Sequence, residues 1–351
     1  MMDKFRFALC IAVALIAGSS SLQAQENDSH QYNTLAKSGD DAMLFMRMQD
    51  IAFVDKVRIC GPSKYYQPRS ECQFKDSLRS NQLKFHSYVF FPKDLKQNKK
   101  YPVVIFSHGG IHSSVSSGSV HIFRELVAQG YIVAAPDYRG STGYGKDLYE
   151  AIDYGGLENE DVLALRDYMV ESYKIVDADR IGLLGWSHGG MISLMNILNY
   201  PDKYACAYAG VPVSDVTYRL SYQQKDYIKN FTQKYHVNAT PEENPAEYAR
   251  RSPVTYASKL CKPLKIVTCA NDDDVSWTEV KRMIDALEAN NKEFEYEIYP
   301  KMQGAHSFER MDIVESTDIR YKTYQFLARY LKPKHPFKNT DQLRKAGYFY
   351  Y

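Results

Sequence analysis

The run RIGLLGWSHGG at residues 180–190 joins an apolar segment to a turn of the form G-x-S-x-G. Its apolar part, residues 180–184, is typical of a buried parallel strand, and residues 190–199 continue with a helical pattern. A sharp strand-to-helix turn holds a serine hydroxyl above the sheet in a strained conformation, and it needs glycines where the chain doubles back. The pattern therefore predicts that Ser187 is a nucleophile; the alternative is an idle serine in a glycine-rich loop.

Apolar runs and helical patterns alternate on both sides of this turn. The other expected strands cover residues 83–91, 101–106, 131–135, 205–211, 264–270 and 294–299. The expected helices cover residues 34–50, 121–129, 158–173, 190–199, 277–290 and 317–331. Such alternation indicates a mostly parallel sheet with helices on both faces. We therefore predict an α/β-hydrolase fold over residues 83–335.

Residues 212–259 separate two of the expected strands and are rich in aromatic side chains. A connection this long inside one domain usually carries structure or function of its own. Two interpretations stay open for this insert: extra surface helices, or a cap over an active site.

A serine hydroxyl needs a base, and in this fold the partners follow in the order serine, acid, histidine. Most of the nine histidines precede Ser187, adjoin it, or lie in the insert or the C-terminal tail. His306 follows the last expected strand in a glycine-containing loop, where the base belongs. The acid should lie at the end of the preceding strand, where Asp272, Asp273 and Asp274 are adjacent. Asp272 is our choice to orient His306 and Asp273 is the fallback, whereas Asp274 could cap the helix that follows.

Such a site also needs a pair of backbone N–H donors for the oxyanion. The expected strand at residues 101–106 runs into Ser-His-Gly-Gly at residues 107–110, which is similar to the H-G-G-G-type loop that supplies one donor. We nominate the N–H groups of Gly110 and His188. His108 and His112 could be mistaken for a metal pair, but they lie on a loop and no third ligand is evident. We expect no metal and no cofactor.

Composition and charge narrow the class of protein. The chain has 351 residues and a formal net charge of +2, which gives no reason to expect nucleic acid as a partner. Residues 1–24 combine a basic start, a short apolar stretch and a small-residue site, as in a signal peptide cleaved after Ala24. We therefore expect export to the periplasm or the medium, with no membrane span after cleavage. Residues 25–82 then form an N-terminal extension and residues 336–351 a C-terminal tail.

Cysteines in an exported chain meet an oxidising compartment. Cys60 and Cys72 bracket a loop rich in polar and turn residues, so we expect a disulfide between them. Cys206 and Cys269 lie in apolar runs and are interpreted as buried thiols.

Taken together, these motifs resemble the catalytic domain of the prolyl oligopeptidase family of serine peptidases. The resemblance covers residues 83–333 and rests on the 185–190 turn, on the Arg-Gly-Ser-Thr-Gly-Tyr-Gly run at 139–145 and on the 272–275 stretch. By this resemblance Asp272 aligns with the family's acid and His306 with its base. Most members carry an N-terminal β-propeller, for which about sixty residues are too few. We also find no counterpart of the acidic pair with which dipeptidyl peptidases hold a free amine.

The resemblance implies an exported serine hydrolase that cleaves a peptide bond in a small substrate through an acyl-enzyme. The first alternative is a carboxylesterase, or an esterase for acetyl or feruloyl groups on carbohydrates, with the same triad. The alternative of another class is a non-catalytic binding protein on a hydrolase scaffold. The oligomeric state is left open.

Overall fold

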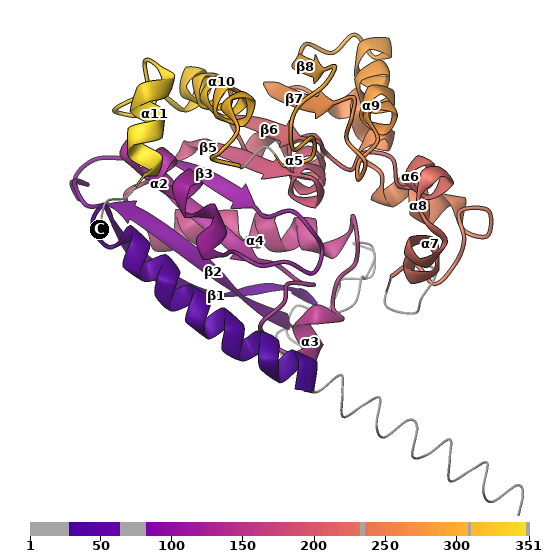
Figure 1. Ribbon diagram of the computed structural model, residues 1–351, viewed down its shortest axis with the longest axis horizontal. Coiled ribbons are helices and arrows are strands. Elements are labelled where there is room, and N and C mark those ends of the chain that lie inside the picture. Colours follow the sequence, from indigo (N-terminus) through magenta and orange to yellow (C-terminus); the bar gives the residue numbers. More distant parts are fainter. Residues whose placement is uncertain (1–27, 64–81, 232–235, 308–309, 349–351) are drawn as a thin grey trace, which may run out of the picture.

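One eight-stranded sheet organises the molecule (Figure 1). The computed structural model describes residues 28–63, 82–231, 236–307 and 310–348. The strands lie in the order β1-β2-β4-β3-β5-β6-β7-β8. The β1–β2 and β2–β4 pairs are antiparallel, and every later pair is parallel. The strands are β1 Ala52–Ser63, β2 Gln82–Pro92, β3 Tyr101–Ser107, β4 Ile132–Asp137, β5 Val176–Trp186, β6 Cys206–Gly210, β7 Leu264–Cys269 and β8 Glu295–Tyr299.

Each face of the sheet carries its own hydrophobic core, which is why the central strands are apolar throughout. All residues of β3 are buried. Side chains alternate between the faces of a strand, so Val103 and Ile105 enter one core, whereas Val104 and Phe106 enter the other. The predicted α/β-hydrolase fold with a mostly parallel sheet is confirmed.

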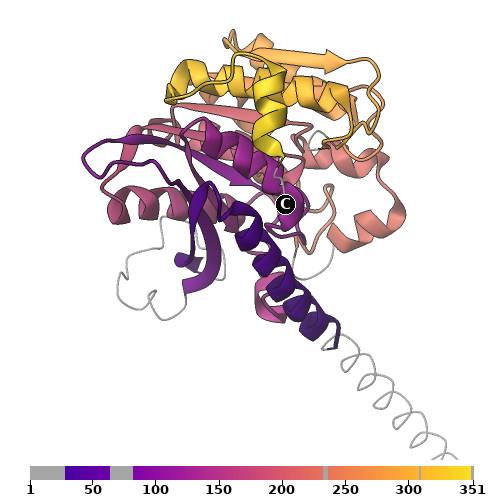
Figure 2. The ribbon, with the colours of Figure 1, turned by 60° about the vertical axis from the view of Figure 1, so that its left-hand side comes forward.

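Helices cover both faces (Figure 2). One face is covered by α4 Leu157–Ser172, α5 His188–Asn199 and α9 Trp277–Ala289. The other is covered by α2 Val120–Ala128, α10 Val314–Leu331, α11 Thr340–Gly347 and a helix over residues 28–48, here called the N-terminal helix. The predicted helices lie within a few residues of those observed. Within the described ranges, no helix is both long enough and apolar enough to cross a bilayer.

The N-terminal region holds a strand that the sequence analysis does not anticipate. β1 lies inside the expected extension, residues 25–82, and pairs with β2 along the sheet edge. Its charged residues at positions 55, 56 and 58 hide the apolar pattern that a buried strand would show. Cys60 is exposed within β1, and Cys72 lies outside the described residues, so the expected disulfide stays a prediction.

Shorter helices fill the connections. The 212–259 insert contains α6 Val216–Tyr222, α7 Lys225–Phe231, α8 Pro245–Arg251 and the 3-10 helix η5 Pro253–Lys259. The others are α3 Lys146–Tyr149 and the 3-10 helices η3 Ser117–Ser119 and η4 Pro201–Lys203. The expected C-terminal tail includes α11, whose Leu343 is fully buried in the α2–α10 core.

Candidate active site

Ser187 occupies the sharp turn between β5 and α5. Its backbone has φ 56° and ψ −121°, in a region that L-residues rarely adopt. The Ser187 N–H donates to the Gly210 carbonyl at 2.9 Å, which ties the turn to the end of β6. This strained conformation, held by neighbouring backbone, is the one predicted for a nucleophile at the start of a helix.

Glycine is required at position 189 because two backbone segments touch there. A Cβ on Gly189 would lie 2.0 Å from the Ser107 carbonyl oxygen at the end of β3. The first turn of α5 therefore presses directly on the loop that leaves β3. This contact brings the His-Gly-Gly loop beside Ser187.

The His-Gly-Gly loop passes close to the serine. A Cβ on Gly109 would lie 3.4 Å from the Ser187 Cβ and 3.2 Å from the Trp186 carbonyl oxygen. Gly110 has φ 72°, so the loop turns away through a conformation that favours glycine. In the described part of the chain, neither the Gly110 N–H nor the His188 N–H is bonded to another backbone carbonyl. The two predicted oxyanion donors, one on the loop after β3 and one at the start of α5, thus have no backbone acceptor in the described part of the chain.

Asp272 and His306 meet at the carboxyl ends of β7 and β8. His306 Nδ1 lies 2.7 Å from Asp272 Oδ2. The other carboxylate oxygen accepts the backbone N–H groups of Asp274 at 2.9 Å and Val275 at 3.0 Å. The Asp272 carboxylate is fully buried and held on both oxygens, so it is fixed in orientation. The structure therefore pairs His306 with Asp272 rather than with the fallback, Asp273.

A second carboxylate faces the other nitrogen of the same imidazole. His306 Nε2 lies 3.5 Å from Asp274 Oδ2. Burial of the ring opposes its charged form, but the hydrogen bond and charge of Asp272, helped by Asp274, raise the pKa of His306. Among the described residues no hydrogen bond links His306 to Ser187; catalytic hydrogen bonds are commonly long without substrate and tighten in the complex.

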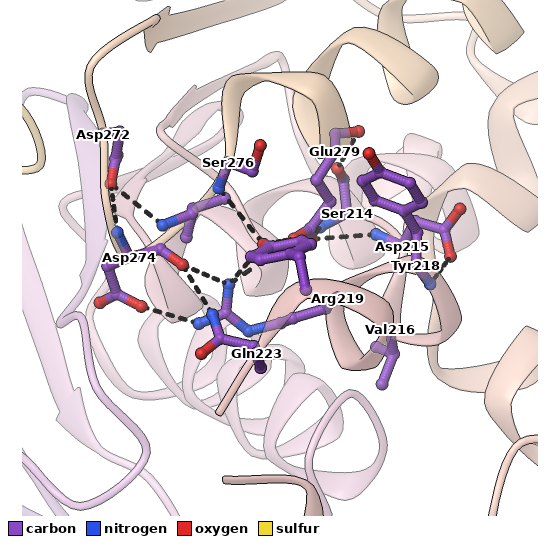
Figure 3. A network of polar contacts seen from close by, with 12 residues as sticks. Ser214, Asp215, Val216, Tyr218, Arg219, Gln223, Asp272, Asp274, Ser276 and Glu279 are labelled. Carbon is purple, nitrogen blue, oxygen red and sulfur yellow. Dashed lines mark hydrogen bonds and ion pairs between the residues drawn. The ribbon is translucent and has the colours of Figure 1, made fainter. Parts of the chain in front are cut away.

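Asp274 is held from the insert by a buried arginine, as Figure 3 shows. Arg219 of α6 donates from Nη2 to Asp274 Oδ1 at 2.8 Å and from Nη1 to the Asp274 carbonyl at 3.1 Å. Gln223 donates to the same carbonyl at 2.9 Å. The insert is thereby fastened to the loop that carries the acid.

The same network reaches the helix that follows the acid loop. Tyr222 bonds Glu279 of α9 and accepts the Ser276 N–H at 3.2 Å. Glu279 Oε1 accepts the Ser214 N–H at 2.7 Å, and burial raises the pKa of the Glu279 carboxyl. The alternative role considered for Asp274, as the cap of α9, is not observed: Ser276 caps that helix by accepting the Thr278 N–H.

A buried histidine–glutamate pair holds the turn that carries Ser187. His188 Nε2 lies 3.1 Å from Glu158 Oε1, and Glu158 also accepts the N–H groups of Gly155 and Gly156. Burial alone would favour the neutral carboxyl, but the imidazole and the backbone donors lower the pKa of Glu158 to about 2. The first residue of α5 is therefore anchored to the start of α4.

The N-terminal helix holds the loop that continues from Gly110. Asp40 accepts the Ser117 N–H at 3.0 Å and its hydroxyl at 2.5 Å. Lys37 donates to the Val115 carbonyl at 2.8 Å, while the Val115 N–H donates to Asp137 at 2.6 Å. Burial raises the pKa of Asp137 to about 6. Both sides of the loop are thus clamped.

His108 serves the scaffold. Its Nε2 lies 2.9 Å from the Ser141 hydroxyl, and its ring stacks on Tyr138 with centroids 4.2 Å apart. Burial lowers the pKa of His108 to about 3, so the ring is neutral.

Four residues that support the site were not predicted from the sequence: Arg219, Glu158, Lys37 and Asp40. Each is a charged residue within a helix, where a solvated surface role is the ordinary expectation. One signal was present for Arg219, since it lies within the aromatic-rich part of the insert. No comparable signal marks Glu158 or Asp40.

Two family models match parts of this chain. The model of the prolyl oligopeptidase family matches residues 117–334, which is more than half of the chain. A second model, named platelet-activating factor acetylhydrolase, isoform II, matches residues 84–146.

Individual relatives are larger proteins. Dipeptidyl peptidase 8 of Mus musculus is 28% identical over 257 residues, covering 70% of this chain and 27% of the relative. Dipeptidyl aminopeptidase BIII of Pseudoxanthomonas mexicana is 29% identical over 234 residues, covering 64% and 34%. Acylamino-acid-releasing enzyme of Rattus norvegicus is 28% identical over 240 residues, covering 66% and 32%. The chain thus spans about a third or less of the length of these relatives.

Solved structures share the fold. An acylaminoacyl peptidase in complex with Z-Gly-Gly-Phe-chloromethyl ketone superposes with a TM-score of 0.64 at 20% identity, covering 84% of this chain and 44% of that one. A puromycin-hydrolyzing peptidase of Mycobacterium tuberculosis gives 0.66 at 21% identity, covering 80% and 39%. With a family model matched over residues 117–334 and this fold shared, the chain belongs to the prolyl oligopeptidase family.

Proposed function

We propose that the chain is a serine peptidase in which Ser187, His306 and Asp272 form a catalytic triad. The observation that carries the proposal is the 2.7 Å contact between His306 Nδ1 and a fully buried, doubly bonded Asp272 carboxylate. That contact fixes the ring with Nε2 available as the base. The strained turn at Ser187 supplies the matching nucleophile.

The reaction follows from these positions. The Ser187 Oγ attacks the substrate carbonyl carbon while His306 Nε2 takes the hydroxyl proton. The Gly110 and His188 N–H groups donate to the resulting oxyanion. The tetrahedral intermediate collapses, the carbon–nitrogen bond breaks, and His306 returns the proton to the leaving amine. Water then attacks the acyl-enzyme by the same sequence and releases the acid and free Ser187.

An esterase with the same machinery is the second candidate. The match of residues 84–146 to an acetylhydrolase model favours it, because that segment includes β3 and the predicted oxyanion loop. Two similar relatives, dipeptidyl peptidase 8 and dipeptidyl aminopeptidase BIII, are named as peptidases, which favours amide cleavage.

A substrate panel distinguishes these candidates. The panel pairs p-nitrophenyl esters and acetylated or feruloylated sugars with aminoacyl, acylaminoacyl and X-Pro anilides, using Ser187→Ala as the control. We expect anilide cleavage that falls by at least about 10⁴-fold in the variant. Ester cleavage alone would make the protein an esterase, and activity that survives in Ser187→Ala would overturn the triad.

A fluorophosphonate label tests the third possibility, a binding protein without catalysis. We expect one label per chain, on Ser187, in folded protein. Folded wild-type protein that takes no label would contradict the proposed nucleophile.

We also propose that residues 1–24 direct export to the periplasm or the medium. The support is the basic, apolar and small-residue order of that segment. N-terminal sequencing of protein recovered outside the cytoplasm should begin at Gln25. An intact Met1 on the recovered protein would contradict cleavage.

A further inference from the structure

The outward face of the N-terminal helix carries a continuous apolar stripe. Its members recur every three or four residues and span about four turns: Tyr32, Leu35, Ala36, Gly39, Ala42, Met43 and Met46. We call this set the outer stripe. All seven are exposed, with Tyr32 at 72% and Leu35 at 74% of their full accessibility. At 100° per residue, they fall on one arc of about 120° centred on Gly39.

The stripe points directly away from the domain. The opposite side of the helix holds Lys37, Asp41, Leu44 and Met48, all buried against the sheet and its loops. A Cβ placed on Gly39 would meet no atom within 4 Å. Figure 1 shows this helix along the outer margin of the molecule.

Exposed apolar side chains of this density are unusual on a helix whose outer face meets only water. A surface helix normally presents charged and polar residues outward. Here no charged residue lies on the arc between positions 32 and 46. Beyond its two ends, Asp28 and Asp50 fall on the same arc, and Asp50 is paired with Arg124 at 2.6 Å. We therefore expect another apolar surface to pack against the outer stripe.

The order of side chains along the outer stripe indicates that the surface packed against it is a second copy of the same helix. Side chains of similar size lie at equal distances before and after Gly39. The pairs are Ala36 and Ala42 at three residues from it, Leu35 and Met43 at four residues, and Tyr32 and Met46 at seven residues. When two copies of such a helix cross antiparallel at Gly39, small residues meet at the crossing. Leu35 then packs against the partner's Met43, and Tyr32 against the partner's Met46. This is the self-complementarity that a twofold interface requires.

We propose that the outer stripe joins two copies of this chain into a twofold dimer, with the N-terminal helices antiparallel and crossing at Gly39. Small residues at the crossing let the backbones approach closely, and the longer side chains seal both ends. A net charge of only +2 per copy presents little repulsion. The stripe is about 21 Å long and offers less than the roughly 800 Å² per partner of a stable complex. The dimer should therefore be reversible, with a dissociation constant on the order of 1–100 µM.

Sedimentation velocity over a concentration series tests the proposal on the full chain as purified. We expect a shift from monomer to dimer in the micromolar range. Gly39→Arg should raise the dissociation constant more than tenfold, because it places two charges at the crossing. Arginine has the higher helix propensity, so the fold is not put at risk. Ser38→Arg, which adds the same charge 100° around the helix, is the matched control and should change the constant less than threefold.

Cysteine substitutions test the geometry itself. Gly39→Cys should form an intermolecular disulfide with its own copy under mild oxidation, above the background from Cys60 and Cys261. Leu35→Cys should cross-link only when mixed with Met43→Cys, because these two positions face each other across the twofold axis. Ser38→Cys should give no more than background.

Three results would overturn the proposal. The first is a monomer at every concentration up to several hundred micromolar. The second is a dimer that Gly39→Arg leaves intact, which would place the interface elsewhere. The third is cross-linking of Leu35→Cys with itself but not with Met43→Cys, which would mean a parallel pair. A chain that stays monomeric and binds lipid vesicles through the outer stripe would also overturn the proposal, because the cover would then be lipid.

Discussion

His306 lies between two carboxylates that have different roles. Asp272 is buried and fixes Nδ1, whereas Asp274 is half exposed and faces Nε2, the atom that accepts the serine proton in the proposed triad. Both negative charges stabilise the imidazolium, and together they raise the pKa of His306. A base with a raised pKa is inactive over a wider acidic range, because only the neutral ring accepts a proton.

Asp274→Asn should therefore extend activity toward acid. Removing this charge removes one cause of the raised pKa, so the acidic limb of kcat/KM should move to lower pH. Asp273→Asn, one residue away with no contact to the ring among the described residues, is the control and should leave the limb in place. A limb that moves equally in both variants, or moves upward in Asp274→Asn, would contradict this reading.

Asp272→Asn should lower kcat by about 10⁴-fold with little change in stability. An amide can still occupy the turn, but it no longer selects the tautomer in which Nε2 is the base. Steady-state kinetics on the same anilide would measure the loss, and urea unfolding would check the fold. If Asp273→Asn were the damaging change instead, the assignment of the acid would be wrong.

At the scale of elements, helix α6 is bonded to the loop between β7 and α9, which carries Asp272 and Asp274. Arg219 is almost completely buried, and its guanidinium bonds Asp274, Tyr222 and Tyr227. Nη1 also lies 3.6 Å from the buried Glu279 carboxylate. The insert is therefore a braced part of the site in this structure.

Arg219→Met should destabilise the protein by about 3–5 kcal/mol, because it leaves the Glu279 carboxylate buried without its cation. Urea unfolding would measure the change. Arg282→Ala is the matched control: Arg282 pairs with Asp215 from the surface and is half exposed, so its loss should cost less than about 1 kcal/mol. Equal losses in the two variants would show that the buried network is not the source of stability.

The loop after Gly110 depends on another element, the N-terminal helix. Asp40→Ala removes the acceptor for the Ser117 N–H and hydroxyl. We expect kcat to fall roughly 10-fold to 100-fold, short of the 10²–10³ that loss of an oxyanion donor costs, while KM changes less than about threefold.

Two comparisons separate this positioning role from a general loss of stability. Asp40→Asn keeps an acceptor oxygen and should restore most of kcat. Asp50→Ala, at the end of the same helix but away from the loop, should leave kcat unchanged. A rise in KM with constant kcat in Asp40→Ala would argue for a role in substrate binding instead.

At the scale of the molecule, the N-terminal helix and β1 complete the catalytic domain. Leu44 and Met48 are fully buried in the core shared with β2 and α2, and Lys37 bonds Asp41, Tyr88 and the Val115 carbonyl. The segment expected to be an extension is continuous with the sheet.

A chain that begins at residue 25 should accordingly be folded and active, whereas one that begins at residue 50 should not. The shorter chain loses buried apolar area and leaves Asp137 without the nearby Lys37 ammonium, 3.6 Å away. Thermal unfolding by circular dichroism, together with anilide hydrolysis, would compare the two. Full activity in the shorter chain would mean that the helix is dispensable.

The sequence was sufficient wherever one local pattern decided the structure. The apolar runs predicted seven of the eight strands, and the G-x-S-x-G turn placed Ser187 at a strained junction. Chain order and position after the expected strands indicated His306 and the three aspartates 272–274, and the family resemblance favoured Asp272, which does meet His306. The alternative in which Asp274 caps α9 did not hold, because Ser276, directly before the helix, accepts the Thr278 N–H.

What could not be predicted depends on contacts between distant segments. β1 was missed because an edge strand with one exposed side carries charges. Arg219, Glu158 and Asp40 act through partners in other elements, and nothing in their local sequence identifies those partners. The helix in the C-terminal tail was missed because its stability comes from packing Leu343 under α2 and α10.

The buried Glu125 of α2 has a consequence for how the protein is made. Its carboxylate is neutralised by Arg320 and bonded by Tyr324, which follow 195 and 199 residues later in the chain. During synthesis α2 must therefore wait for nearly the whole polypeptide before its partners emerge. In the nascent chain, α2 therefore reaches its final packing late and is incompletely folded until then. If residues 1–24 direct export, as proposed, this delay would keep the chain unfolded while it crosses the membrane.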